Sequence, residues 1–143
     1  MQISLQYKTT QAHTIQSLQI KKNRSGNTEK YNDPITIDEL SAAINSTQDC
    51  KSPGEDQIQN IMVKKLHIDT KNYILELYNK IWTQETIPKE WNNSIIIPIL
   101  KPGKPSNLPS SYRPIALNSC LCKIMEKIVN TRLAWYLENQ LKI

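Results

Sequence analysis

The side chains best suited to chemistry are cations in the stretch IIIPILKPGKPSNLPSSYRPIAL, residues 95–117. Residues 91–125 contain no Asp or Glu, and their four positive charges are Lys101, Lys104, Arg113 and Lys123. An arginine offers a planar fork to phosphate oxygens, and a lysine offers a point charge. An uncompensated basic loop therefore predicts a site that grips phosphate groups.

Five prolines decide what kind of element can hold these cations: Pro98, Pro102, Pro105, Pro109 and Pro114. Proline cannot donate to a β-ladder, so the two apolar runs fit an edge hairpin rather than a central sheet. The loop prolines restrict the unfolded chain, and Gly103 permits a positive φ in the turn. Lys101 would face Arg113 across the hairpin mouth, which is unfavourable unless an anion lies between them. A second interpretation stays open, because Lys and Pro also keep exposed hairpins from aggregating edge to edge.

The elements that position this hairpin are predicted to be helices. We expect helices from Thr36 to near Gln48, from Asp56 to Leu66, from about Asp69 to before Pro88 and after Ser119, with strands at 94–100 and 112–117. Thr36 and Glu39 have the spacing of a capping box, and Asp56 and Ser119 are of the types that cap helices. The fold class is therefore α+β, mostly α-helical with one β-hairpin.

Each predicted helix carries apolar residues at helical spacing that we expect to be buried. Met62 lies on the stripe of the second helix and Leu77 on that of the third. The tryptophans Trp82, Trp91 and Trp135 lie in or beside such stripes, so packing is favoured over the stacking of bases. Residues 1–33 lack a sustained pattern and are predicted to be a flexible polar linker ahead of an ordered region at 34–143.

The totals favour an intracellular protein with a polyanionic partner. The net charge is +5 over 143 residues, which makes nucleic acid a reasonable partner. No apolar stretch is long enough to cross a membrane, and the N-terminus has no apolar signal core. Three cysteines are an odd number, which favours reduced thiols. The Cys and His residues lack the paired spacing of a zinc site, so we expect no metal site.

Two motifs resemble a known family. The stretch from Trp91 through the Ile-Ile-Pro-Ile-Leu-Lys-Pro-Gly-Lys and Ser-Tyr-Arg-Pro-Ile-Ala-Leu segments is similar to the fingers region of reverse transcriptases, above all those of jockey-type non-LTR (LINE-like) retrotransposons. About forty residues upstream, Lys-Ser-Pro-Gly-Glu-Asp-Gln-Ile at 51–58 resembles the Ser-Pro-Gly-x-Asp-Gly-Ile block of the same family. Gln57 replaces the usual glycine. We expect this change to matter little, because the position would begin a helix.

The resemblance implies roles for particular residues. Lys101 would contact the γ-phosphate side of an incoming deoxynucleoside triphosphate, and Arg113 its α- and β-phosphates. The residues implied at the template strand are Ser52, Pro53, Gly54, Asp56, Lys64 and Lys104. For Asp56 a role as a helix cap is favoured over a template contact, and for Lys64 a place on a solvated helix face is favoured. The implied partners are an RNA template, a DNA primer, the triphosphate and the palm region of the same polyprotein, in the cytoplasm and nucleus.

The same resemblance implies a catalytic centre that these 143 residues do not contain. The family holds two Mg²⁺ ions on palm aspartates, one pair of which lies in a Tyr/Phe-x-Asp-Asp motif, and no such motif occurs here. We therefore expect Mg²⁺ in a full-length enzyme, no cofactor on this fragment, no catalytic residue within it and no primer extension by it alone. The alternatives are a non-enzymatic nucleic-acid-binding module and a protein-interaction module in which the apolar stripe of residues 121–137 docks a partner helix.

Overall fold

The structure is a computed structural model that describes residues 32–141. Its helices are α2 (Ile37–Asn45), α3 (Asn60–Lys64), α4 (Ile68–Gln84) and α5 (Cys120–Leu141), and its strands are β1 (Ile95–Leu100) and β2 (Tyr112–Leu117). Short 3₁₀ helices, η3 (Lys89–Asn92) and η4 (Pro109–Ser111), precede the two strands. The predicted α+β class, mostly helical with one hairpin, is confirmed. The predicted linker lies outside the described residues except for its last two positions.

Helix α2 begins where the sequence predicts. Thr36 Oγ1 accepts a hydrogen bond from the Glu39 amide at 3.2 Å, and Glu39 Oε2 accepts one from the Thr36 amide at 2.9 Å. This reciprocal pair is a capping box, which satisfies two donors that the first turn of a helix cannot satisfy itself. Helix α2 then turns Leu40 and Ile44 into the core, where both are almost fully buried.

The core lies between α2, α4 and the first half of α5. Tyr78 of α4 is fully buried and donates its hydroxyl to the Leu121 carbonyl of α5 at 2.6 Å. Trp91 packs edge-on against Tyr78, with ring centroids 6.1 Å apart. Trp82 and Trp91 are both buried, so their predicted packing is confirmed, whereas Trp135 is 45% exposed and its predicted packing is wrong.

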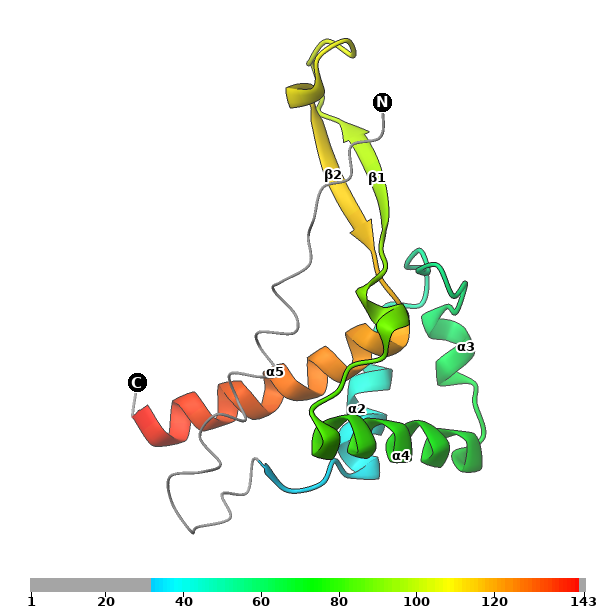
Figure 1. Cartoon of the computed structure of the whole chain (residues 1–143), viewed down its shortest axis with the longest axis vertical. Coiled ribbons are helices and arrows are strands. Elements are labelled where there is room, and N and C mark those ends of the chain that lie inside the picture. Colours follow the sequence, from blue (N-terminus) through cyan, green and yellow to red (C-terminus); the bar gives the residue numbers. More distant parts are fainter. Residues whose placement is uncertain (1–31, 142–143) are drawn as a thin grey trace.

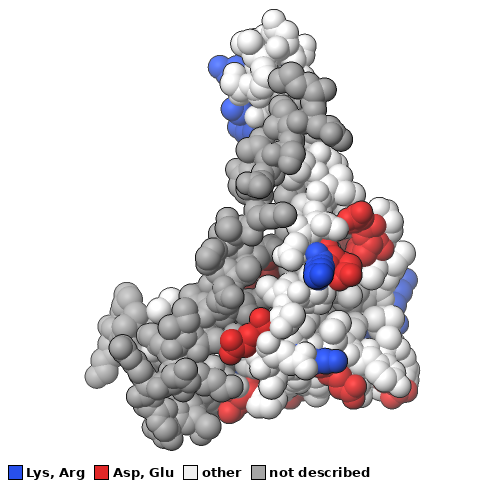
Figure 2. Space-filling view, in the orientation of Figure 1, with Lys and Arg blue, Asp and Glu red and all other residues white. Residues whose placement is uncertain are grey.

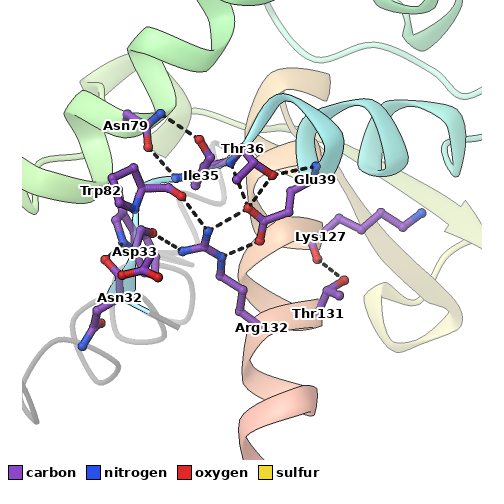
Figure 3. Close-up of polar contacts among 11 residues, drawn as sticks. Asn32, Asp33, Ile35, Thr36, Glu39, Asn79, Trp82, Lys127, Thr131 and Arg132 are labelled. Carbon is purple, nitrogen blue, oxygen red and sulfur yellow. Dashed lines mark hydrogen bonds and ion pairs between the residues drawn. The ribbon is translucent and has the colours of Figure 1, made fainter. Parts of the chain in front are cut away.

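Arg132 ties α5 to α2 and to the chain that enters it (Figure 3). Its guanidinium donates to both carboxylate oxygens of Glu39, at 2.7 and 2.8 Å. It also donates to the Asp33 and Pro34 carbonyls and lies 5.6 Å from the centre of the Trp82 ring. The hydrogen bond from Arg132 is the main cause that lowers the pKa of Glu39, with bonds from Thr36 adding to it and burial opposing it.

The second helix is shorter than predicted. It covers only Asn60–Lys64, and Asp56 does not cap it, because Asp56 Oδ1 accepts the Ile58 amide in a turn. Gln57 has φ of 56° and is left-handed, so the expectation that it begins a helix is wrong. The buried apolar residue of α3 is Val63, while Met62 is 55% exposed. Because α3 has only five residues, residues 58–66 do not form the single helical stripe that the sequence predicts.

Three further details differ from the sequence-based expectation. Helix α4 begins at Ile68, and the preceding His67 accepts a hydrogen bond from the Asp69 amide at Nδ1. Leu77 of α4 is 38% exposed. The contact of this helix with the core is filled by Tyr78, Ile81 and Trp82. Ser119 precedes α5 as predicted, but its buried hydroxyl makes no hydrogen bond among the described residues, so it is no side-chain cap.

The hairpin projects away from the helical body as a separate arm (Figure 1). Strands β1 and β2 pair antiparallel over six residue pairs, from Ile95 opposite Leu117 to Leu100 opposite Tyr112. Pro98 lies opposite Pro114. Every residue of β1 is exposed, so neither face of this two-stranded sheet is covered by the described helices. Within residues 32–141 no further strand pairs with either edge, which is the environment that tolerates proline in a strand.

Candidate nucleic-acid interface

The far end of the hairpin is held in one shape by backbone contacts. The Lys101 amide donates to the Ser111 carbonyl at 2.8 Å, and Lys101 Nζ donates to the Ser110 carbonyl at 2.9 Å. The Lys104 amide closes a turn onto the Lys101 carbonyl, and Gly103 within it has φ of 71°. The predicted positive φ of this glycine is confirmed. The loop therefore presents its cations from a defined turn.

The register corrects the predicted pairing of Lys101 with Arg113. Arg113 lies directly opposite Ile99, and Lys101 lies two residues further along, opposite Ser111. Because side chains alternate between the faces, Lys101 and Arg113 are diagonal neighbours on one face. Such neighbours lie about 7–8 Å apart, a separation that one anion can bridge and that relieves direct repulsion.

The charge of the arm has one sign. Figure 2 shows Lys and Arg near the tip of the hairpin and no acidic side chain on the visible surface of the arm, whereas the acidic patches lie over the helical body. Arg113 and Lys104 are exposed, and no hydrogen bond or ion pair joins their side chains to another described residue. These side chains are available to an anion in solvent.

The Ser-Pro-Gly loop lies at the opposite end of the arm, at its base. Gly54 is buried, and a Cβ built on it would stand 2.6 Å from both the Asn118 carbonyl carbon and the Ser119 amide nitrogen. Only glycine allows this loop to approach the junction between β2 and α5 so closely. Gly54 thus positions the hairpin on the body. Sequence reasoning placed it at the template and missed this contact, for which the only signal was the glycine itself.

The remaining residues of the predicted template site do not form one cluster. Ser52 and Asp56 are exposed and Pro53 is half-buried, all on the same loop. Lys64 is turned inward to the connection between α2 and α3, where Nζ donates to the Thr47 carbonyl at 2.7 Å and to Asp49 Oδ1 at 2.5 Å. Along β2, Arg113 lies four residues and Ser111, the partner of Lys101, six residues from Leu117 at the base of the arm, which is roughly 13 and 20 Å at about 3.3 Å per residue.

Two lysines near the loop received no binding role from the sequence. Lys51 and Lys123 line a cavity between the Ser-Pro-Gly loop, the base of β2 and the start of α5. Lys123 was counted among the four cations of residues 91–125 without a role of its own. The signal that could have located Lys51 is its place directly before the Ser-Pro-Gly block.

The described residues hold no group of three or more His, Cys, Asp or Glu side chains arranged to bind a metal ion. The residues of this part of the chain therefore do not fit the pair of Mg²⁺ ions of a polymerase centre. Within the same residues, no helix combines the length and the apolar character that crossing a membrane requires.

The chain that forms this basic arm, the Ser-Pro-Gly loop at its base and their helical support is similar in sequence to RNA-directed DNA polymerases. The chain is 41% identical over 100 residues to a probable RNA-directed DNA polymerase from transposon BS of Drosophila melanogaster, a match that covers 70% of this chain. It is 35% identical over 107 residues to a probable RNA-directed DNA polymerase from transposon X-element of the same species, and 33% identical over 101 residues to the polymerase from mobile element jockey of Drosophila funebris.

These matches confirm the predicted resemblance. The matched relatives are RNA-directed DNA polymerases from transposons and from mobile element jockey, the kind of protein that the two motifs resemble. It spans 11 to 12% of the length of the three relatives named above. No family model matches the chain.

Proposed function

We propose that this chain is the fingers region of a retrotransposon RNA-directed DNA polymerase. In this role the hairpin tip binds the phosphates of the incoming deoxynucleoside triphosphate, and the Ser-Pro-Gly loop borders the template strand. The observation that carries the proposal is the arm itself, which is exposed on both faces and carries only positive charge, with Lys101 and Arg113 diagonal on one face. The arrangement supports binding of a polyanion from more than one side.

The proposal assigns Lys101 and Arg113 to the triphosphate and Lys104 to nucleic acid. Charge reversal of the first two residues tests it. We expect the double variant Lys101→Glu and Arg113→Glu to lose binding of both a deoxynucleoside triphosphate and single-stranded RNA, measured by fluorescence anisotropy at low salt. The matched control is Lys80→Glu with Lys89→Glu, which changes the net charge equally on exposed positions of the helical body. Equal loss in both double variants would reduce the effect to net charge and contradict the proposed site.

The salt dependence of binding gives a second measure. With three or four phosphate contacts, the slope of log K against log salt for a single strand is expected to be about −2 to −3. A slope near zero would favour the interpretation of the arm as a hairpin that only avoids aggregation.

We also propose that these 143 residues do not extend a primer by themselves, because they contain none of the paired aspartates that hold Mg²⁺ in the resembled family, where Mg²⁺ would serve the complete enzyme. The test is a primer-extension assay with an RNA template, Mg²⁺ and all four deoxynucleoside triphosphates. Templated incorporation by the purified chain would overturn this part of the proposal. Binding without extension is also the result that a non-enzymatic nucleic-acid-binding module would give.

One form of the protein-interaction alternative is not supported. It requires the stripe of α5 to be exposed, but Ile124, Met125, Ile128 and Val129 are buried in the core. Apolar side chains also remain exposed on the hairpin, where Ile96, Ile99 and Ile115 are more than 40% exposed. The hairpin therefore offers a surface for the rest of a larger polymerase as well as for phosphates.

A further inference from the structure

Three of the five prolines in the arm directly follow its cations. The dipeptides are Lys101-Pro102, Lys104-Pro105 and Arg113-Pro114, whereas Pro98 and Pro109 follow Ile97 and Leu108. All five prolines are exposed, so none of them contributes to the hydrophobic core. They therefore act on the backbone of the arm rather than on the packing of the body.

The Lys-Pro-Gly-Lys segment at the tip forms a type II turn. The Lys104 amide donates to the Lys101 carbonyl at 3.2 Å, and Gly103 has φ of 71°. A type II turn needs a positive φ at its third residue and favours proline at its second, because the ring holds φ at about −65°. Pro102 thus sets a turn that brings the Cα atoms of Lys101 and Lys104 within about 7 Å of each other, the upper limit for the ends of a β-turn.

A proline also restricts the residue that precedes it. A steric clash with the ring disfavours the helical conformation of that residue and leaves extended ones. Each cation of the arm is restricted in this way. Arg113 lies in the extended strand β2, and the Lys101 amide continues the ladder by donating to the Ser111 carbonyl. The restriction therefore favours the backbone conformation in which the structure holds these two side chains.

These prolines remove no hydrogen bond from the ladder. In an antiparallel ladder, hydrogen-bonded pairs alternate with pairs whose amides point outward. Because Lys101 donates to Ser111, the alternation makes Pro98 and Pro114 one of the outward-pointing pairs. Pro102 and Pro105 lie in the loop between the strands. The arm thus keeps its ladder while the backbone of each cation is restricted.

We propose that Pro102, Pro105 and Pro114 are positioning residues, which order the cation before each of them so that less conformational entropy is lost when phosphates bind. The inference rests on the proposed function, since it assumes that the cations of the arm bind phosphates. A side chain that is already ordered in the free protein loses less freedom on binding. The effect is expected to be smallest at Pro114, because the ladder also holds Arg113, and largest at Pro102, which both restricts Lys101 and sets the turn.

The test compares Pro102→Ala/Pro105→Ala with a matched control, Pro98→Ala/Pro109→Ala, which removes two exposed prolines that follow no cation. Binding of a fluorescent deoxynucleoside triphosphate to the 143-residue chain is measured by anisotropy at low salt. The restriction by one proline changes a conformational equilibrium about 2- to 5-fold, so the first variant is expected to bind about tenfold more weakly than the wild type. The control is expected to bind like the wild type, and an equal loss in both variants would overturn the inference.

A double-mutant cycle separates positioning from a general effect on the loop. Pro102→Ala is expected to weaken triphosphate binding about 2- to 5-fold in the wild-type background and hardly at all in Lys101→Gln, which keeps Arg113. A proline that only stabilises the loop or prevents aggregation would lower the affinity equally in both backgrounds, and that result overturns the inference.

The salt slope for single-stranded RNA gives an independent readout. Because every cation remains in Pro102→Ala/Pro105→Ala, the slope is expected to keep its wild-type value while the affinity falls. A smaller slope would mean that phosphate contacts had been lost with the shape of the arm, which contradicts positioning. Wild-type affinity for the triphosphate in this variant overturns the inference alone. Absence of triphosphate binding by the wild-type chain overturns the proposed function together with it.

Discussion

Single residues far apart in the sequence hold this molecule together. Arg132 reaches Glu39 across 93 positions and satisfies two backbone carbonyls of the segment that enters α2. Its guanidinium has five donors in a planar fork, so one arginine can pair with Glu39 at the start of α2 and also donate to the carbonyls of the preceding loop. The Glu39 side chain is one-third exposed and that of Arg132 only 11%, so the loss of Glu39 would leave a charge largely buried.

We predict that Glu39→Gln destabilises the protein by about 2 kcal/mol at pH 7, because a charge-assisted bond is replaced by a neutral one. The pKa of Glu39 is lowered in the folded state, so its stabilisation is present above the ordinary value of 4.5 and is lost as pH falls through the lowered one. Urea unfolding at pH 7 and at steps below pH 4.5 measures this. The variant should lose less stability on acidification than the wild type. Asp38→Asn, at an exposed neighbour, is the control for loss of an acidic charge, and an equal effect there would contradict the role of Glu39.

Gly54 allows close packing because it has no Cβ atom. We predict that Gly54→Ala destabilises the protein by about 2 kcal/mol, because the added methyl meets backbone atoms that cannot turn aside. Thermal unfolding measures this, with Ser52→Ala on the exposed part of the same loop as control. An unchanged melting temperature would mean that the loop does not pack against the start of α5.

At the scale of elements, the connection between α2 and α3 contains a strained position. Gln57 is left-handed at φ of 56°, where a side chain costs about 1–2 kcal/mol relative to glycine. The resembled family has glycine here, so the glutamine costs conformational free energy. This cost was not predicted from the sequence, which placed Gln57 at the start of a helix. The Gln57 side chain recovers part of it by donating to the Gly54 carbonyl at 3.3 Å.

We predict that Gln57→Gly stabilises the protein by about 0.5 to 1 kcal/mol, since relief of strain exceeds the added freedom of the unfolded chain. The same exchange in the right-handed backbone at the end of α4, Gln84→Gly, should instead destabilise by about 1 kcal/mol. The denaturant midpoint is therefore expected to rise in Gln57→Gly and to fall in Gln84→Gly, relative to the wild type. A loss of stability at position 57 would show that its side-chain contact outweighs the strain.

The molecule consists of a helical body, which holds the hydrophobic core, and an arm that has no core of its own. Burial in the body raises the pKa of Cys120 to about 11 and that of Cys122 to about 12, with nearby carboxylates adding to the effect of burial. Cys50, on the α2–α3 connection, is exposed. The thiols therefore report on whether the body is folded, because the thiolate is the reactive form.

We predict that at pH 7.5 one of the three thiols reacts rapidly with an aromatic disulfide reagent and two react only on unfolding. Cys50→Ser should remove the rapid phase and leave the slow one. Three rapid thiols in the wild-type chain would show that the start of α5 does not pack as described. Gly54→Ala should accelerate the slow phase, since it loosens the contact beside Cys120.

Local patterns determined the capping box of α2, the two strands and the proline-bearing hairpin, because each depends on residues close together in the chain. Two such local motifs, about forty residues apart, carried the family resemblance. Tertiary structure decided the rest. Asp56, Gln57 and Ser119 were assigned from residue type, but their conformations depend on how the Ser-Pro-Gly loop meets the start of α5, more than sixty residues away. The diagonal placement of Lys101 and Arg113 came from the register, and the cavity between Lys51 and Lys123 came from packing. Residue types show which side chains can bind a phosphate. Only long-range contacts bring two such side chains close enough to bind the same phosphate.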